Sequence, residues 1–433
     1  MENKNENLKN TILDLSAEYF ENVNSTKTFV PYISSVPVAG RVLDKEDLEY
    51  LINSSLEMWL TAGKYTEEFE KGLREFTGIK HALFVNSGSS ANLLALSGLK
   101  IFYDLQDGDE VITSAVNFPT TLNPIIQNNL KPVLVDVEKG SFNIDPEKIL
   151  EKITPKTKGI VLAHTLGNPF NLKKVKDICE QYNLFLMEDM CDAFGSKYDG
   201  KLVGQFGDVA TLSFYPAHHI TTGEGGAVLT NKPKLKKIIE SLRDWGRDCY
   251  CPPGKDNTCK KRYEWQLGGL PYGYDHKYIY SNIGYNLKAT DMQASLGVSQ
   301  LKKLPRFIEI RKQNFNFLYK EFSKFTEFEL PVWEDKSDPS WFGFPISVKP
   351  EAKFNRNDLL KHYNENKIGT RLLFAGNIVL QPAYLDMKLG KQSDFPIANS
   401  VVENTFWLGV FPGLTEDHLN FVVQTTKEFI DEI

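Results

Sequence analysis

The sequence predicts an α/β protein in which a large domain, built on a mostly parallel sheet, is followed by a smaller C-terminal α+β domain. Strand-like and amphipathic helical segments alternate between residues 45 and 245, which is the pattern of βαβ units. The strand segments are apolar along most of their length, as strands covered on both faces are. The apolar residues make up 41% of 433 residues, enough for a sizeable core.

Each element can be assigned from its own stretch of sequence. The segment 44–61 has helical spacing of its apolar residues, 81–87 is β-rich, and 89–102 is helical again. Further strands are expected at 108–116, 131–137, 157–167, 184–190, 208–214 and 226–231, and further helices at 172–183 and 288–322. Most of these segments are bounded by Gly, Pro, Asn or Asp, which favour turns.

The segment 245–285 interrupts this alternation. It is rich in Gly, Pro, Cys and Tyr and has no clean period, so we expect a long ordered excursion from the fold. We therefore divide the chain into an N-terminal segment, 1–40, a large domain, 41–285, that includes the excursion, and a linking helix with a small C-terminal domain, 286–433.

Composition and charge exclude several classes of protein. The net charge of −6 gives no basic field for nucleic acid or for an anionic membrane. The start, "MENKNENLKNTILDL", does not resemble a signal peptide, and no apolar run is long enough to span a bilayer. We expect a cytoplasmic protein. There, its five cysteines would not form a disulfide framework, and their clustering indicates metal or redox chemistry.

The stretch "FVNSGSSANLLAL", residues 84–96, is the first candidate for a binding site. A strand runs through Gly88 and Ser89 into a helix, so backbone N–H groups and serine hydroxyls meet at the helix N-terminus. Such a turn suits a phosphate. The same pattern is also typical of an ordinary serine N-cap on a buried helix.

The stretch "LFLMEDMCDAFG", residues 184–195, is the second candidate. Asp189 ends an apolar strand, and the carboxyl ends of parallel strands form the edge where α/β proteins bind ligands. This carboxylate could face a pyridinium nitrogen and keep the ring protonated. Alternatively, it caps the next helix.

The stretch "SFYPAHHITTGEGGA", residues 213–227, is the third candidate. Its strand is expected to end at the same sheet edge, where Ser213 offers another hydroxyl for a phosphate. "GEGG" allows a tight turn before the return strand. The adjacent histidines, His218 and His219, are ambiguous on their own.

Taken together and in this order, the three stretches resemble the sugar aminotransferase and dehydrase family, DegT/DnrJ/EryC1/StrS, over roughly residues 35–430. The resemblance also covers "GYNLKATDMQASLGVSQL", and it implies the fold type I of pyridoxal phosphate enzymes, which is that of aspartate aminotransferase. It implies a homodimer as well. The cofactor-binding residues that it implies are Gly88, Ser89 and Ser213 at the phosphate, Phe118 stacked on the pyridine ring, Asp189 at the pyridine nitrogen, and Asn286 at the phosphate of the neighbouring subunit.

His218 occupies the position where the family usually carries the lysine that binds the cofactor covalently. Histidine cannot form that Schiff base but is a competent base at neutral pH. We therefore expect pyridoxamine 5'-phosphate as the cofactor and dehydration at C3 of a nucleotide-linked 4-keto sugar as the reaction, with His218 as the base. Asp192 and Tyr215 are interpreted as active-site neighbours that favour elimination, and His219 as orienting substrate or satisfying a backbone group.

Four of the five cysteines follow the pattern C-x57-C-x-C-x7-C, namely Cys191, Cys249, Cys251 and Cys259. Four thiolates suit either zinc or a [2Fe–2S] cluster, and the spacing does not decide between them. The position of Cys191 just after Asp189 favours a redox centre beside the pyridine ring. Cys179 falls on the apolar face of a helix, and we expect it in the core.

Combined with His218, the cysteine pattern resembles the iron–sulfur branch of the family. That resemblance implies a CDP-linked 4-keto-6-deoxyhexose as substrate, and a [2Fe–2S] cluster that passes single electrons from a separate NADH-dependent flavin/iron–sulfur reductase. It places the enzyme in 3,6-dideoxyhexose synthesis for the O-antigen of lipopolysaccharide. Two alternatives stay open, a cluster-free dehydratase of a GDP-linked sugar and an inactive dimeric scaffold. The run 260–262 could dock an acidic reductase or simply be a solvated loop.

Overall fold

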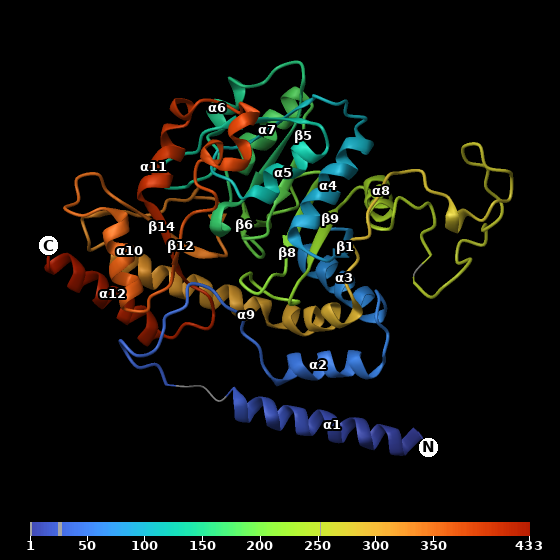
Figure 1. Ribbon diagram of the computed structural model, residues 1–433, viewed down its shortest axis with the longest axis horizontal. Helices are drawn as coiled ribbons and strands as arrows, with labels where there is room; N and C mark the ends of the chain where they lie inside the picture. Colours follow the sequence, from blue (N-terminus) through green and yellow to red (C-terminus); the bar gives the residue numbers. More distant parts are fainter. Residues whose placement is uncertain (1, 25–27, 252) are drawn as a thin grey trace.

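The computed structural model describes residues 2–24, 28–251 and 253–433. Its centre is a seven-stranded sheet of order β1-β9-β8-β5-β4-β2-β3 (Figure 1). The strands are β1 (His81–Val85), β2 (Glu110–Ser114), β3 (Lys131–Val135), β4 (Thr157–Ala163), β5 (Phe185–Asp189), β8 (Val209–Ser213) and β9 (Gly226–Thr230). Only β9 runs antiparallel to its neighbours within this sheet. The α/β class and the mostly parallel sheet expected from the sequence are confirmed.

Helices cover both faces of this sheet. On β1 the side chains alternate, so that Leu83 and Val85 pack with one core and Ala82 and Phe84 with the other. The first core also contains buried residues of α4 and α8, and the second contains residues of α3, α7 and α9. The helices of this part are α3 (Lys64–Thr77), α4 (Gly88–Phe102), α5 (Pro119–Gln127), α6 (Pro146–Leu150), α7 (Leu172–Tyr182), α8 (Pro233–Arg243) and α9 (Asp291–Phe322).

The C-terminal part is built on an antiparallel sheet of order β10-β12-β14-β13. Its elements are β10 (Phe328–Glu329), β12 (Gly343–Val348), α10 (Arg356–Glu365), β13 (Thr370–Arg371), α11 (Pro396–Asn404), β14 (Thr405–Gly409) and α12 (Glu416–Asp431). A small third sheet joins β6 (Lys197–Tyr198), β7 (Lys201–Leu202) and β11 (Ser337–Asp338). Short 3₁₀ helices are η1 (Thr165–Gly167), η2 (His276–Tyr278), η3 (Ile378–Leu380), η4 (Pro382–Met387) and η5 (Gln392–Asp394).

The helix α9 connects the two parts. Near its start Ala294 and Val298 pack in the core of the large sheet, and near its end Phe315 and Phe322 pack in the core of the C-terminal sheet. Val36, in the N-terminal segment, pairs with Ile368 and packs in the C-terminal core. The domain boundaries at 40 and 285 stay a prediction, because packing crosses both of them.

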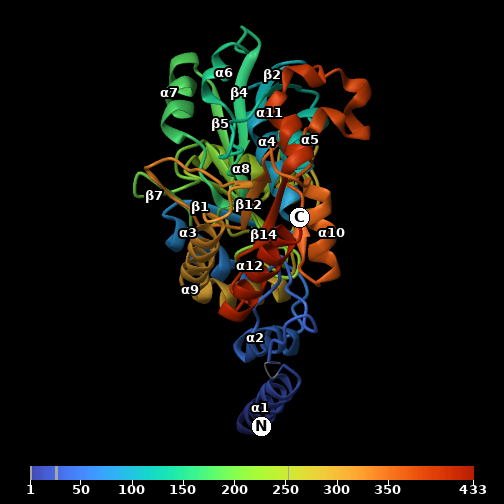
Figure 2. The same cartoon turned by 90° about the vertical axis from the view of Figure 1, so that its left-hand side faces the viewer.

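The predicted helix at 44–61 is present as α2 (Lys45–Leu56), whereas the sequence pattern did not indicate helix α1 (Glu2–Val23). Helix α1 packs on α2, which packs on α9. Both views show α1 as the outermost layer, on the side of α2 away from the sheet (Figures 1 and 2). Its apolar residues are few, and Leu15 and Tyr19 are more than half exposed, so the periodic apolar signal is weak. None of the helices in the described ranges combines the length and apolarity needed to cross a bilayer.

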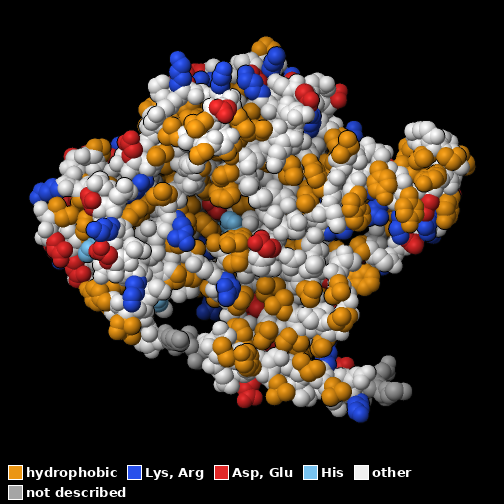
Figure 3. All heavy atoms as spheres, in the orientation of Figure 1, with side chains coloured by type: hydrophobic (Ala, Val, Ile, Leu, Met, Phe, Trp, Pro, Cys, Tyr) orange, Lys and Arg blue, Asp and Glu red, His pale blue; other side chains and the backbone are white. Residues whose placement is uncertain are grey.

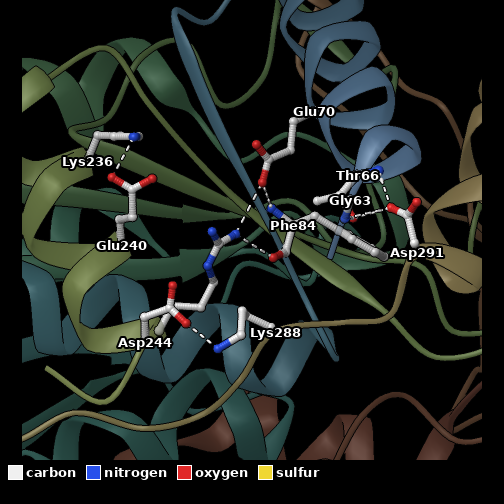
Figure 4. Close-up of polar contacts among 10 residues, drawn as sticks. Gly63, Thr66, Glu70, Phe84, Lys236, Glu240, Asp244, Lys288 and Asp291 are labelled. Atoms are coloured by element: carbon white, nitrogen blue, oxygen red, sulfur yellow. Dashed lines mark hydrogen bonds and ion pairs between the residues drawn. The ribbon is translucent and has the colours of Figure 1, made fainter. Parts of the chain in front are cut away.

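A buried carboxylate holds α3 and α9 together. Asp291, at the first position of α9, accepts hydrogen bonds from the backbone N–H groups of Gly63 (2.9 Å) and Thr66 (2.8 Å) and from the Thr66 hydroxyl (2.9 Å) (Figure 4). These donors are orphans at the N-terminus of α3. Nearby, Glu70 accepts from the backbone N–H of Phe84 and from Arg243, which links α3, β1 and α8.

We expect Asp291→Ala to lower the free energy of unfolding by about 3 kcal/mol, because it leaves buried N–H groups without an acceptor. Asp291→Asn keeps one acceptor oxygen and should cost less. Urea denaturation measures both variants. Equal stability of Asp291→Ala and the unsubstituted protein would show that α3 is held in another way.

Candidate active site

A cavity of about 590 Å³ opens between the carboxyl edge of the large sheet and the C-terminal part. Figure 3 shows a hollow near the middle of the molecular face, in which histidine and acidic side chains are visible. The lining residues that the sequence analysis had singled out are Gly88, Ser89, Phe118, Asp189, Cys191, Asp192, Ser213, Tyr215 and His218. The three sequence stretches therefore meet in one place, as expected for strands that end at the same sheet edge.

Asp189 lies at the end of β5 and is 5% exposed. Its Oδ2 accepts hydrogen bonds from Asn92 of α4 (2.8 Å) and Thr121 of α5 (2.6 Å), and its Oδ1 accepts from the backbone N–H of Cys191 (3.1 Å). The Thr211 hydroxyl in turn donates to Asn92 Oδ1 (2.6 Å). This carboxylate is therefore fixed in the cavity floor, and it does not cap a helix, the alternative left open by the sequence.

The sequence analysis named neither Asn92 nor Thr121. Asn92 follows the serine-rich turn on α4, and Thr121 follows Phe118 on α5. Asn92 lies in the stretch 84–96 quoted above and Thr121 lies three residues after Phe118, but nothing in one sequence indicates that they converge on Asp189.

The N-terminus of α4 approaches β8 closely. A Cβ atom at Gly88 would lie 2.5 Å from Ser213 Cβ and 2.9 Å from its Oγ. Only glycine fits there, so that the backbone N–H groups at the start of α4 and the hydroxyls of Ser89 and Ser213 border one corner of the cavity. The N-cap of the helix is Ser87, whose side chain accepts a hydrogen bond from the Ser90 N–H. The ordinary N-cap role that the sequence left open therefore belongs to Ser87 and not to Ser89.

The geometry fits pyridoxamine phosphate. The Gly88, Ser89 and Ser213 corner has the donors that a phosphate needs, and Asp189 would face the pyridine nitrogen. Phe118 is about half exposed on the cavity wall and packs edge-on against Phe374, with ring centroids 6.3 Å apart. A pyridine ring could stack on its free face.

His218 reaches the same cavity from the loop after β8. Its Nδ1 lies 3.3 Å from Asp192 Oδ1, within ion-pair distance but outside the angles of a hydrogen bond. Its ring lies against Phe342, with centroids 5.2 Å apart. Since Nδ1 faces Asp192, Nε2 is the nitrogen left for the reacting atoms. Tyr215 lines the cavity and is about half exposed.

His219 is buried, and its Nε2 donates to the carbonyl of Ser340 (2.9 Å). Burial, with the positive charge of Arg311 nearby, holds the pKa of His219 well below its usual range. Of the two readings left open by the sequence, the structure supports the one in which His219 satisfies a backbone group. Arg311 itself was not singled out, because an arginine within a long helix gives no sequence signal of its surroundings.

Asn286 lies outside the cavity on an exposed surface. It pairs with Asp244 as an isolated bridge, and its Oδ1 accepts from Lys288 Nζ (2.9 Å). The predicted role of Asn286 at a neighbouring subunit's phosphate stays a prediction, since one chain does not test it.

The structure places the cysteines in two locations. Cys191 lines the cavity, where burial and the carboxylates of Asp189 and Asp192 hold the pKa of its thiol well above the usual range. The other three lie in the excursion, which extends beyond α8 away from the large sheet (Figure 1). Cys179 lies on α7 with its side chain buried in the core, as expected, and burial raises its pKa to about 12.

Within the excursion, the thiols of Cys249 and Cys251 interact with each other, whereas the thiol of Cys259 lies against a histidine. Burial raises the pKa of Cys249, while partial burial of Cys251 is outweighed by hydrogen bonds from Thr258 that lower its pKa. Cys259 Sγ lies 3.2 Å from His276 Nε2. Across the described ranges, no three His, Cys, Asp or Glu side chains are arranged to hold a metal ion. Four thiolates are the ligands that a [2Fe–2S] cluster needs. In the described residues of one chain, however, the four cysteines are not arranged around one metal site.

The three residues of the basic run 260–262 have different surroundings. Arg262 donates twice to Asp275 (3.0 and 2.7 Å), which stabilises the excursion, while Lys260 and Lys261 are exposed. The two exposed lysines are compatible both with docking of an acidic reductase and with a solvated loop.

The chain matches a family model and two curated relatives over most of its length. Residues 41–427 match the model of the DegT/DnrJ/EryC1/StrS aminotransferase family. The chain is 53% identical over 428 residues to the lipopolysaccharide biosynthesis protein RfbH of Salmonella typhimurium, covering 98% of each chain. It is 48% identical over 426 residues to the dTDP-4-dehydro-2,6-dideoxy-D-glucose 3-dehydratase of Saccharopolyspora spinosa, covering 98% of this chain and 92% of the relative.

A solved structure supports the same fold. The GDP-4-keto-6-deoxy-D-mannose 3-dehydratase of E. coli with bound hydrated PLP superimposes with a TM-score of 0.79 at 27% identity, covering 90% of this chain and 98% of that one. The expected fold of pyridoxal phosphate-dependent aminotransferases is therefore confirmed.

We expect Gly88→Ala to destabilise the protein by about 1–3 kcal/mol, because the new methyl group overlaps Ser213. Adding Ser213→Gly should recover part of that loss by removing the opposing Cβ. Gly269→Ala is the matched control, since open space surrounds Gly269. If thermal unfolding shows Gly88→Ala to be as stable as Gly269→Ala, the close approach of α4 and β8 is not required.

Proposed function

The chain belongs to the DegT/DnrJ/EryC1/StrS aminotransferase family, and on this premise we propose that it dehydrates C3 of a nucleotide-linked 4-keto-6-deoxy sugar. Relatives include sugar 3-dehydratases and similar solved structures include aminotransferases, so the choice between these reactions depends on the site. The observation that carries the choice is His218, which stands in the cavity at the lysine position and beside Asp192.

Histidine changes what the site can do. When bound, pyridoxamine phosphate would supply an amine that condenses with the 4-keto group, and a ring that holds the electron pair left by removal of the C4′ proton and returns it as the C3 hydroxyl leaves. Asp189 would hold the pyridine nitrogen, and Gly88, Ser89 and Ser213 the phosphate. His218 Nε2 would remove the proton from cofactor carbon C4′, because a neutral imidazole is a base suited to neutral pH. Asp192 would hold the ring through Nδ1.

The cavity mouth suits the nucleotide part of such a substrate. Arg41 and Arg371 line the cavity and are exposed, so their guanidinium groups are accessible to phosphate oxygens, which guanidinium groups bind well. We propose CDP-4-dehydro-6-deoxy-D-glucose as the substrate, as the resemblance to the iron–sulfur branch implies. The Salmonella relative is a lipopolysaccharide biosynthesis protein, which supports the same role here, and we propose O-antigen 3,6-dideoxyhexose synthesis in the cytoplasm.

We further propose that Cys191, Cys249, Cys251 and Cys259 bind a [2Fe–2S] cluster that receives electrons from a separate NADH-dependent flavin/iron–sulfur reductase. The spacing supports this and the placement of Cys191 in the cavity agrees with it, but the cysteines do not converge within one chain. The centre would require the excursion to approach Cys191. We also propose a homodimer, in which Asn286 would contribute to the partner's phosphate site.

A second candidate is a cluster-free dehydratase. The superposition with the E. coli GDP-4-keto-6-deoxy-D-mannose 3-dehydratase favours it, as does the separation of the cysteines. Iron content and nucleotide preference distinguish the two candidates.

The decisive experiment mixes the protein with pyridoxamine phosphate and a 4-keto-6-deoxyhexose linked to CDP, dTDP or GDP in D₂O. We expect deuterium to enter cofactor C4′ fastest with the CDP sugar, as mass spectrometry would show. Faster exchange with another nucleotide would replace only the substrate assignment. No exchange with any of them would leave the inactive scaffold as the better description.

His218→Lys should reverse the chemistry of the site. We expect this variant to bind pyridoxal phosphate covalently, with a visible absorption band that borohydride reduction removes, and to lose dehydration. His218→Asn is the control that should do neither. If His218→Lys retains full dehydration, the base lies elsewhere.

Anaerobic purification followed by iron, sulfide and zinc analysis tests the metal centre. We expect two irons and two sulfides per chain, as a [2Fe–2S] cluster requires, and their loss in Cys249→Ser. Cys179→Ala, which alters a cysteine of the core, should retain the metal. Stoichiometric zinc without iron would overturn the redox part of the proposal.

A further inference from the structure

Arg311 is a buried charged residue that has no role in the reaction proposed above. It lies in the middle of α9 and is 1% exposed. Burial lowers its pKa to about 9, and the negative charge of Asp192 opposes that change, so the guanidinium stays charged at neutral pH. In the part of the chain that the structure describes, its hydrogen bonds go to main-chain carbonyls and none to a carboxylate. A buried charge held in this way is costly, so its contacts need an explanation.

The guanidinium joins three segments around the candidate base. Nη1 donates to the carbonyls of Trp341 (3.3 Å) and Phe342 (3.2 Å), and Nη2 donates to the carbonyl of His218 (3.3 Å). It thus connects α9, the loop after β8 and the segment that leads into β12. Arginine can do this because its donors lie in one rigid plane.

These contacts define where the His218 ring can lie. The ring packs on Phe342, whose carbonyl is held by the same guanidinium. At the ring edge, Nδ1 lies 3.3 Å from Asp192 Oδ1. The next residue is held as well, since His219 donates to Ser340. The backbone of His218, its ring and its Nδ1 each have a partner, so Nε2 is the ring nitrogen left for the cavity that His218 lines.

We propose that Arg311 is a positioning residue for His218. By holding the His218 carbonyl and the Phe342 main chain together, it keeps Nδ1 of the imidazole beside Asp192. The Asp192 carboxylate favours the proton on Nδ1, which leaves Nε2 to accept a proton. The inference rests on the proposed function, in which His218 is the base. If Arg311 only stabilised the fold, its replacement would lower stability without affecting His218. Experiments can distinguish this structural role from the positioning of His218.

Three variants make the comparison. Arg311→Met removes the charge and the donors but keeps the length of the side chain. Arg311→Lys keeps the charge and part of the bonding. Asn314→Leu is the matched control, because Asn314 lies one turn further along α9, is 9% exposed, and also donates to main-chain carbonyls, those of Val410 and Phe411, but does not contact His218.

The first measurement is deuterium entry at cofactor C4′, with sugar affinity measured separately by fluorescence quenching. We expect Arg311→Met to slow exchange at saturating sugar by about 100-fold, as expected for a misplaced catalytic group, with sugar affinity changed less than about twofold. Arg311→Lys should recover part of the rate, and Asn314→Leu should keep it while losing a similar amount of thermal stability. Equal exchange rates in Arg311→Met and Asn314→Leu would overturn the proposal.

The second measurement needs no turnover. ¹⁵N-histidine spectra of the full-length protein, with the His218 signals identified by their absence from His218→Asn, report which ring nitrogen carries the proton. We expect Nδ1 in the unsubstituted protein and in Asn314→Leu, and a mixture in Arg311→Met, or in Arg311→Lys if Arg311→Met does not fold. An unchanged tautomer in the Arg311 variant would overturn the inference. If the unsubstituted protein shows no deuterium exchange at cofactor C4′, the proposed function fails. The tautomer of His218 alone then shows whether Arg311 positions its ring.

Discussion

The buried carboxylate of Asp189 is the constraint on which the site depends. A carboxylate that is 5% exposed is tolerated only when donors surround it. Here they come from α4, α5 and the turn after β5. For these donors to meet, α4 and α5 must pack against the carboxyl edge of the sheet in one particular register. Satisfying this one group therefore also fixes the phosphate corner at Gly88 and the aromatic wall at Phe118.

A second buried charge anchors the loop that carries His218. Arg311 comes from α9, the long helix that packs in both cores, so the loop of His218 is attached to the element that joins the two parts of the protein. The position of the candidate base is in this way coupled to the packing of the C-terminal sheet. Replacing the usual lysine by histidine is chemically sufficient only if the ring is held, since a histidine that can rotate offers either nitrogen or neither.

The cysteines are arranged by a different principle. Cys191 is fixed by the fold, next to Asp189, whereas Cys249, Cys251 and Cys259 belong to an excursion that has its own small set of contacts. In that excursion Arg262 is paired with Asp275, and the ring of His276 stacks on Trp265 with centroids 4.7 Å apart. An element stabilised by its own contacts can keep its shape while its position relative to the large sheet is set by something else, such as a metal centre or a second subunit.

The sequence by itself determined the fold class, the order of the strands along the chain and the three stretches that meet in the cavity, because apolar periodicity and turn residues are local signals. It also singled out His218, through the resemblance of the stretch 213–227 to the family. It did not reveal α1, whose apolar signal is weak. Only the tertiary structure decided that Asn92 and Thr121 hold Asp189, that His219 bonds a backbone carbonyl, and that Arg311 reaches His218. Each of these contacts joins residues distant in the chain, and their geometry follows from how helices pack on the sheet, which no local pattern encodes.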